Sequence, residues 1–121
     1  MRGFEINNGD LVITNSTFEG FGSWAIQVNG DINGNATVDG CTFNGCTSGI
    51  FKGGIKGDPS TSGTVEGTFT FTNNTLDDQC KGHDGKATAF FGGNLAANNV
   101  ASGNTLGGLA WTPDSACGFG K

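Results

Sequence analysis

A four-residue phrase that occurs four times along the chain is the strongest constraint on its fold. Each copy has a small or polar pair, then Thr, then a bulky apolar residue: Asn15-Ser16-Thr17-Phe18, Gly40-Cys41-Thr42-Phe43, Asn73-Asn74-Thr75-Leu76 and Gly103-Asn104-Thr105-Leu106. An apolar residue stands shortly before each copy, and a second apolar cluster follows it. A unit that repeats in this way and cannot bury its own apolar face must stack on its neighbours.

The spacing of the copies is uneven. Counted from Phe18 through Phe43 and Leu76 to Leu106, successive copies are 25, 33 and 30 residues apart. Repeat proteins keep their core positions and vary the loops between them. The extra residues fall in polar stretches, and we therefore expect loop insertions at residues 56–64 and 77–86.

The composition favours short strands over helices. Gly makes up 23 of the 121 residues and only 14% are charged. Gly, together with the abundant Asn and Thr, disfavours helix and favours strands joined by tight turns. Ten Phe and two Trp, placed in phase with the repeat, supply apolar surface that a disordered chain lacks. We expect one all-β domain over residues 1–121.

The charge and the hydropathy of the chain argue against two partners, a nucleic acid and a membrane interior. The net charge is −5 and the isoelectric point is near 4.4, whereas nucleic-acid binding requires clustered Lys and Arg. No stretch approaches the roughly 20 apolar residues that span a membrane.

The first residues lack the apolar segment of a signal peptide. We expect Met1 to start a fragment or subunit of a longer assembly.

Short strands with frequent turns fit either a sandwich of antiparallel hairpins or a parallel coil. Only the parallel coil places equivalent residues above one another, about 4.8 Å apart, and so favours a phrase that recurs. Over residues 11–111 the phrase resembles the repeats of right-handed parallel β-helix proteins of the pectate-lyase-like class. Residues 43–45 and 53–55 also resemble, faintly, repeats of bacterial surface adhesins. The resemblance implies a short right-handed parallel β-helix of about four coils, of the surface or adhesin kind.

The same pattern predicts the core. One or more apolar side chains of each strand should point inward, and the predicted core residues are Ile13, Phe18, Ile26, Val38, Phe43, Ile50, Phe69, Phe71, Leu76, Phe90, Leu106 and Leu109. Residues 112–121 are expected to form a small C-terminal cover, held by Cys117.

The four cysteines, Cys41, Cys46, Cys80 and Cys117, allow three pairings. With a single His and no closely spaced Cys pair of the zinc-site type, structural zinc is not expected. Two alternatives stay open: buried free thiols, or disulfides formed in an oxidising compartment. The low charge and the high content of Gly, Asn and Thr favour an extracellular protein and hence the disulfides.

The stretch over residues 77–86 combines two acids, the only His and two Lys. Asp77-Asp78 and Gly82-His83 resemble pieces of the inverting site of β-helix polygalacturonases, in which one carboxyl protonates the leaving oxygen and others activate water. Asp84 stands where that motif has a second Gly, the pieces are crowded together, and the partner Arg-x-Lys is lacking. We expect an exposed loop with solvated charges and no enzymatic activity.

Residues 31–39 have oxygen-bearing side chains at alternating positions, as calcium loops do. Asp31, Asn33, Asn35 and Asp39 are the candidate metal ligands. The stretch is similar to the loops of dockerin modules and EF-hands, although Ala36 replaces the turn glycine and Thr42 replaces the closing acid. The alternative is an Asn/Gly turn between strands. Apart from calcium, no cofactor is expected.

A third feature is the set of Thr residues that recurs with the phrase, Thr17, Thr42, Thr75 and Thr105. Regularly spaced hydroxyl groups are how β-solenoid ice-binding proteins meet ice, but Thr also simply suits an outward strand position.

From these observations we expect a non-catalytic, extracellular or cell-surface protein with a structural or adhesive role. Its partner would be another copy, or adjacent β-helix coils, stacked end to end, because end coils present open strand edges. The alternative function is a carbohydrate-active module, a degenerate lyase or hydrolase or a glycan-binding fragment, with a glycan as partner. Ice binding is the lesser alternative.

Overall fold

The protein is all-β, as the composition predicts. The computed structural model describes residues 9–28, 34–52, 67–83, 90–92, 98–114 and 117–119. The strands in these ranges are β1 (Leu11–Thr14), β2 (Thr17–Glu19), β3 (Ile26–Gln27), β4 (Ala36–Asp39), β5 (Thr42–Asn44), β6 (Phe51–Lys52), β7 (Thr68–Thr72), β8 (Thr75–Leu76), β9 (Phe91–Gly92), β10 (Asn98–Ser102), β11 (Thr105–Leu106) and β12 (Leu109–Ala110).

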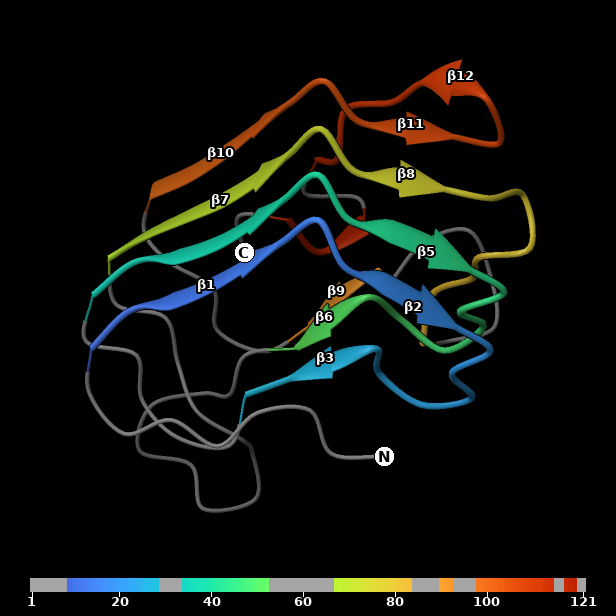
Figure 1. Ribbon diagram of the computed structural model, residues 1–121, viewed down its shortest axis with the longest axis horizontal. Coiled ribbons are helices and arrows are strands. Elements are labelled where there is room, and N and C mark those ends of the chain that lie inside the picture. The colour runs from blue at the N-terminus through green and yellow to red at the C-terminus, as the bar shows by residue number, and fades with distance from the viewer. Residues whose placement is uncertain are drawn as a thin grey trace.

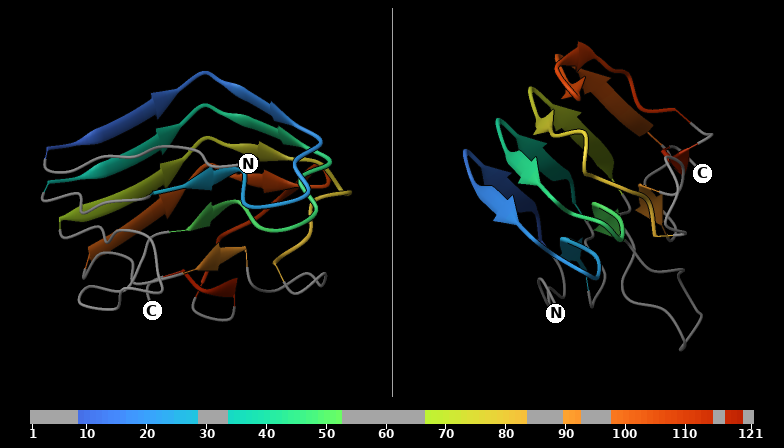
Figure 2. Two further views of the ribbon diagram at one scale, coloured as in Figure 1. Left: turned by 90° about the horizontal axis from the view of Figure 1, so that it is seen from below. Right: turned by 90° about the vertical axis from the view of Figure 1, so that its right-hand side faces the viewer.

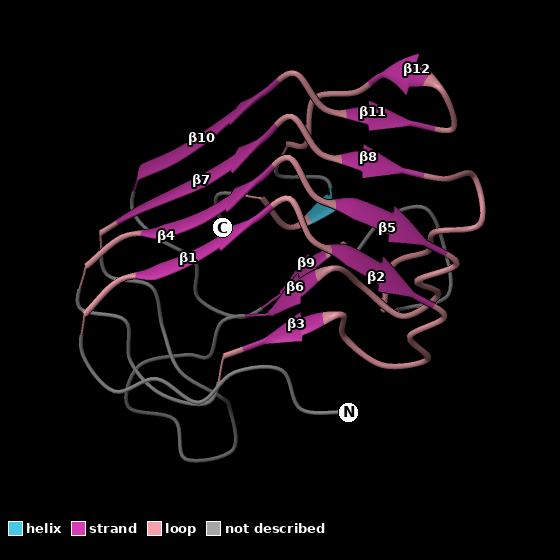
Figure 3. Cartoon of the chain, in the orientation of Figure 1, coloured by secondary structure: helices cyan, strands magenta, loops and turns pink. Residues whose placement is uncertain are grey.

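These strands form three sheets (Figures 1 and 3). From β1 to β11, successive strands of the chain join the first, the second and the third sheet in turn, and β12 then pairs beside β11. One sheet has the order β1-β4-β7-β10, the second β12-β11-β8-β5-β2 and the third β3-β6-β9. All pairs are parallel except β11 with β12. We call β1–β3 unit 1, β4–β6 unit 2, β7–β9 unit 3 and β10–β12 unit 4. Each unit therefore lies directly beside the next (Figure 2).

The four copies of the sequence phrase lie in register. Thr17, Thr42, Thr75 and Thr105 pair in succession, and so do the residues after them, Phe18, Phe43, Leu76 and Leu106. The prediction that equivalent residues stack on one another is confirmed, and the sandwich of antiparallel hairpins is wrong for these strands. Phe18 and Phe43 stack with ring centroids 5.0 Å apart and planes at 8°, which is the contact a parallel, in-register pair allows.

The first residue of the phrase turns the chain from the four-stranded to the five-stranded sheet. Its φ is positive in every unit: 50° at Asn15, 66° at Gly40, 54° at Asn73 and 69° at Gly103. Gly and Asn are the residues that adopt this left-handed conformation at least cost. The small or polar residues of the phrase are therefore required by the backbone at the corner.

The second residue of the phrase is buried in units 2, 3 and 4, as Cys41, Asn74 and Asn104. The Asn74 Oδ1 accepts a hydrogen bond of 2.8 Å from the Cys41 N–H, and its Nδ2 donates to the Val38 carbonyl. Asn104 accepts from the Asn74 N–H and donates to the Phe71 carbonyl. Each Asn thus satisfies backbone groups that the corner would otherwise leave unpaired in the interior.

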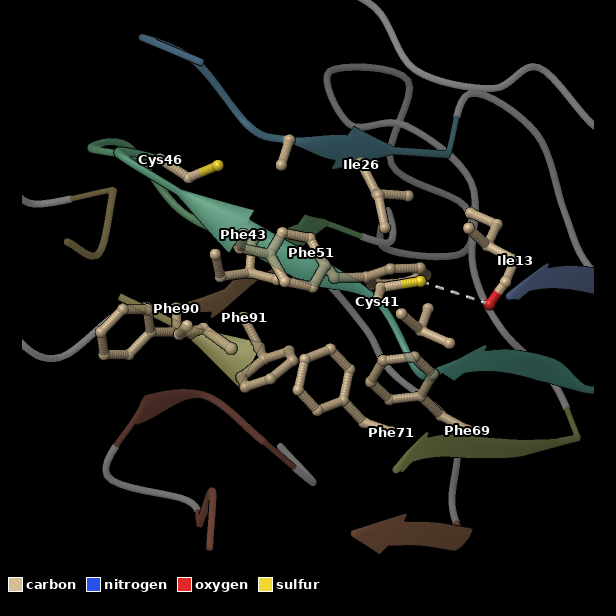
Figure 4. Packing of buried hydrophobic residues seen from close by; sticks show 14 of the residues in the cluster. Ile13, Ile26, Cys41, Phe43, Cys46, Phe51, Phe69, Phe71, Phe90 and Phe91 are labelled. Atoms are coloured by element: carbon tan, nitrogen blue, oxygen red, sulfur yellow. Dashed lines mark hydrogen bonds between the residues drawn. The ribbon is translucent and has the colours of Figure 1, made fainter. Parts of the chain in front are cut away.

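The predicted core is largely confirmed. Figure 4 shows its central aromatic side chains packed together. Nine of the twelve predicted residues are buried, and Phe18 and Leu106 are half-buried against them. Leu109 is wrong, because its side chain is 73% exposed. It lies in β12, which pairs antiparallel with β11 at the end of its sheet, so the repeat no longer decides which way this strand faces.

Part of the C-terminal segment contacts core residues of unit 3. Phe119 packs on Phe91 and Phe69, with ring centroids 5.2 and 5.6 Å apart. Trp111 packs on Phe90 at 5.5 Å. The expected insertion at residues 56–64 lies outside the described residues, as do residues 84–86 of the second one.

Candidate functional site

Of the two acids in the 77–86 stretch, Asp77 is bound by the backbone around it. Both carboxylate oxygens of Asp77 accept from the Gly45 N–H at 3.1 Å, and one also accepts from the Gln79 N–H. Burial raises the pKa of Asp77, but these hydrogen bonds outweigh it and hold the pKa below its usual value. A general acid needs the opposite shift. Asp78 is exposed and contacts the Gln79 amide.

His83 lies elsewhere, against Trp24 of unit 1. Its ring stacks on the Trp24 indole with centroids 4.8 Å apart and planes at 14°, and its Nδ1 is 3.1 Å from the Ser48 Oγ. These contacts give His83 packing and hydroxyl partners rather than a carboxylate. The crowded acid–histidine stretch is a structural feature of this fold and offers no acid–base pair among the described residues.

Trp24 explains why residues 49 and 92 are glycines, which the sequence pattern alone did not explain. A Cβ atom added at Gly49 or Gly92 would overlap its indole ring, so the ring lies across units 2 and 3. Trp24 is 6% exposed. Such a ring holds the units together and is closed to a ligand.

The candidate calcium ligands are not gathered in the described part of the loop. Asp31 and Asn33 lie outside the described residues. Asn35 and Asp39 are separated by the length of β4, roughly 13 Å for four extended residues, whereas ligands of one calcium ion lie within about 2.6 Å of it. The Asn35 Oδ1 accepts from the Thr68 N–H, and Asp39 accepts from Thr72 and Asn73. The calcium site stays a prediction, which a calcium titration would test.

The feature that the structure adds is a regular outer surface on the four-stranded sheet. Outward side chains form two files across its strands: Val12, Thr37, Thr70 and Val100, and next to them Thr14, Asp39, Thr72 and Ser102. The Thr17 file continues this surface around the corner. We call these three files the threonine face. Aligning the four phrases and counting back along each strand would have found it in the sequence.

The threonine face is uncharged except for Asp39. Hydrogen bonds from the Thr72 hydroxyl (2.7 Å) and the Asn73 amide (3.0 Å) lower the pKa of Asp39. Val12 and Val100, 65% and 49% exposed, stand at the two ends of one file. The face offers short hydroxyl and methyl groups on a regular lattice, and no nucleophile activated by a base.

No aromatic platform for a sugar is exposed among the described residues. Trp24, Phe51 and Phe91 are buried, and Phe21 and Trp111 are half-buried in the core cluster. The carbohydrate-active alternative needs such exposed rings and gains no support here. All four cysteines are buried free thiols, the first of the two alternatives left by the sequence.

Comparison of the chain with protein-family models, with curated proteins and with solved structures gives no match. Within the described ranges, His, Cys, Asp and Glu side chains nowhere gather in a group of three that could hold a metal ion. The same ranges contain no helix of the length and hydropathy needed to cross a membrane.

Proposed function

We propose that the chain is a short right-handed parallel β-helix of about four coils that acts as a non-catalytic, extracellular structural or adhesive module. The observation that carries the proposal is the in-register addition of one strand to each of the three sheets by units 1, 2 and 3, which unit 4 continues in the first two sheets. A repeated scaffold with regular outer files is suited to presenting a surface or to joining other coils. The largely uncharged threonine face and the scarcity of charge favour an extracellular setting.

The ends of the stack indicate where such a module associates. At the last unit, β12 covers the edge of β11, and Gly118 approaches the Phe91 backbone. At the first unit, β1, β2 and β3 each have one strand neighbour in the described part of the chain. An unpaired strand edge is a template for another strand. At the other end β10 and β12 also have one strand neighbour each within the described ranges. Association by end stacking therefore joins the edge of unit 1 to another open edge, with another copy or adjacent coils as the partner.

Val12 offers a clean test of this association. Backbone bonds from the Leu11 and Asn15 N–H groups to unit 2 show that the intervening even-numbered residues direct their N–H groups to the open edge. Val12→Pro removes one edge donor and no bond to unit 2. We expect Val12→Pro to lower the mass measured by light scattering at high concentration, with the melting temperature retained.

Two controls accompany that variant. Val12→Thr keeps the edge N–H and should keep the assembly, and Leu109→Lys changes the covered end and should also keep it. A wild-type protein that is a strict monomer at high concentration would contradict end stacking, and so would equal assembly of Val12→Pro and Val12→Thr.

The threonine face favours ice binding as a second candidate function. Its files repeat at the strand spacing of about 4.8 Å, and each Thr in them carries both a hydroxyl and a methyl group. Thr70→Lys, in the middle of the face, should then abolish inhibition of ice recrystallisation. The matched surface variant Leu109→Lys should leave it unchanged. Lack of inhibition by the wild-type protein would eliminate this candidate.

A further inference from the structure

Two of the four cysteines stand at equivalent places in neighbouring units. The Thr47 N–H donates to the Phe21 carbonyl at 3.1 Å, and the Lys81 N–H donates to the Cys46 carbonyl at 2.9 Å. This repeated bond places Phe21, Cys46 and Cys80 in one file, each beside the next. Parallel neighbours are about 4.8 Å apart, which lies inside the Cα separation of roughly 4.4–6.8 Å that a disulfide tolerates.

The two side chains also point the same way. The Cys46 thiol donates to the Phe18 carbonyl at 3.5 Å, and the Cys80 thiol donates to the Phe43 carbonyl at 3.3 Å. Phe18 and Phe43 are themselves paired residues of units 1 and 2. The thiols are therefore held in successive, equivalent pockets with their sulfur atoms adjacent.

A direct contact between the thiols agrees with this placement. A hydrogen bond with Cys80 lowers the pKa of Cys46, and the same contact, with burial, raises the pKa of Cys80. The other two thiols have different partners. Cys41 donates to the Ile13 carbonyl (Figure 4), and Cys117 donates to the Asp114 carbonyl at 3.2 Å.

We propose that Cys46 and Cys80 form a disulfide that joins unit 2 to unit 3 in an oxidising medium, while Cys41 and Cys117 stay reduced. The oxidant is a low-molecular-weight disulfide such as oxidised glutathione. One cysteine thiolate attacks it and releases one glutathione thiolate. The second cysteine then attacks the mixed disulfide and releases the other. Two protein thiols lose two electrons and two protons, and one glutathione disulfide gains them and becomes two glutathione thiols.

The exchange takes place during folding, because both side chains are buried in the folded protein, 0% and 4% exposed. The disulfide closes a loop that contains the whole of β6, β7 and β8. Cross-linking such a loop restricts the unfolded chain, and we expect the melting temperature of the oxidised protein to exceed that of the reduced protein by about 10 °C. This inference is independent of the proposed adhesive role.

The test refolds the reduced full chain from denaturant in a glutathione redox buffer. The protein is then alkylated under denaturing conditions, weighed and mapped by peptide mass spectrometry. Two alkylated thiols and a peptide pair linked through Cys46 and Cys80 are expected. The variants Cys46→Ser and Cys80→Ser should each show no disulfide, and Cys41→Ser and Cys117→Ser should keep it.

Circular dichroism of each reduced variant shows whether it folds, so that a missing disulfide is not confused with a missing fold. Four alkylated thiols in refolded wild-type protein would overturn the proposal. A linked peptide that contains Cys41 or Cys117 would overturn it as well.

Discussion

The side-chain oxygen of Asn15 lies over Gly40 of the next unit, 2.6 Å from the position that a Cβ at residue 40 would occupy. The Asn73 oxygen lies over Gly103 in the same way. The left-handed corner alone would accept Gly or Asn in every unit. The contact explains why the two alternate, since each Asn needs a residue without a side chain above it.

The first prediction concerns this contact. Gly40→Ala should lower the free energy of unfolding by about 1–3 kcal/mol, because it adds a Cβ at positive φ and in contact with Asn15. Urea denaturation measures the change. Gly108→Ala is the matched control, since its φ is also positive but its Cβ would meet nothing within 4 Å.

A double variant separates the two causes. In an Asn15→Gly background, Gly40→Ala should cost less by about 1 kcal/mol, as expected for residues in contact. An equal cost in both backgrounds would show that the backbone conformation alone is responsible and that the Asn–Gly contact contributes nothing.

The second prediction concerns the buried Asn74. Asn74→Ala leaves the Cys41 N–H and the Val38 carbonyl without their partner inside the protein. Each buried unsatisfied group costs about 1–3 kcal/mol, so we expect a loss of about 2–5 kcal/mol in urea denaturation. Thr75→Ala, at the neighbouring exposed position, should change stability by less than about 0.5 kcal/mol. Similar losses for both variants would contradict the role assigned to the buried Asn.

The third prediction contrasts two apolar residues of the same sheet. Phe43 is fully buried and stacks on Phe18, so Phe43→Ala should cost about 3–5 kcal/mol. Leu109 is mostly exposed, and Leu109→Ala should cost less than about 0.5 kcal/mol. Thermal unfolding of the two variants side by side checks this. A large loss at Leu109 would mean that this residue belongs to the core after all.

The fourth prediction concerns acid. Hydrogen bonds from Thr72 and Asn73 lower the pKa of Asp39 below the ordinary value of 3.8. The unfolded chain therefore binds a proton more readily than the folded one, and the stabilisation present above pH 3.8 is lost as the pH falls through the folded-state value. The urea midpoint should drop as the pH is lowered from above 3.8 to below it. In Asp39→Asn that drop should be smaller; an unchanged drop would assign it to other carboxyl groups.

The sequence predicted the stacking well because recurrence carries direct information about register. Four phrases with Thr followed by Phe or Leu can align in one parallel order, and the observed pairs Thr42–Thr75 and Phe43–Leu76 follow it. The core followed from the same alignment. The prediction of the core failed at Leu109, where the pairing changes to antiparallel and the repeat no longer applies.

The surface and the cysteines were less predictable. The outward files of the threonine face become visible in the sequence only when all four phrases are aligned and each strand is counted back from its Thr, because the single strands are too short to show their outward side by themselves. Cys46 follows the second phrase and Cys80 follows the third, and the number of residues between these two phrases differs from the number between the others. The 34-residue separation of the two cysteines differs by one from the 33 residues between Phe43 and Leu76, so counting from the phrase alone misses the pair.

The corner contacts also set a rule for how such an array can change length. Asn15 and Asn73 mark odd units, and Gly40 and Gly103 mark even ones. Removing one internal unit, or duplicating any one unit in place, would bring two corner side chains, or two glycines, face to face. Removing or duplicating two adjacent units preserves the alternation. Variants of this protein that keep its corner geometry and change length within the array should therefore grow or shrink by pairs.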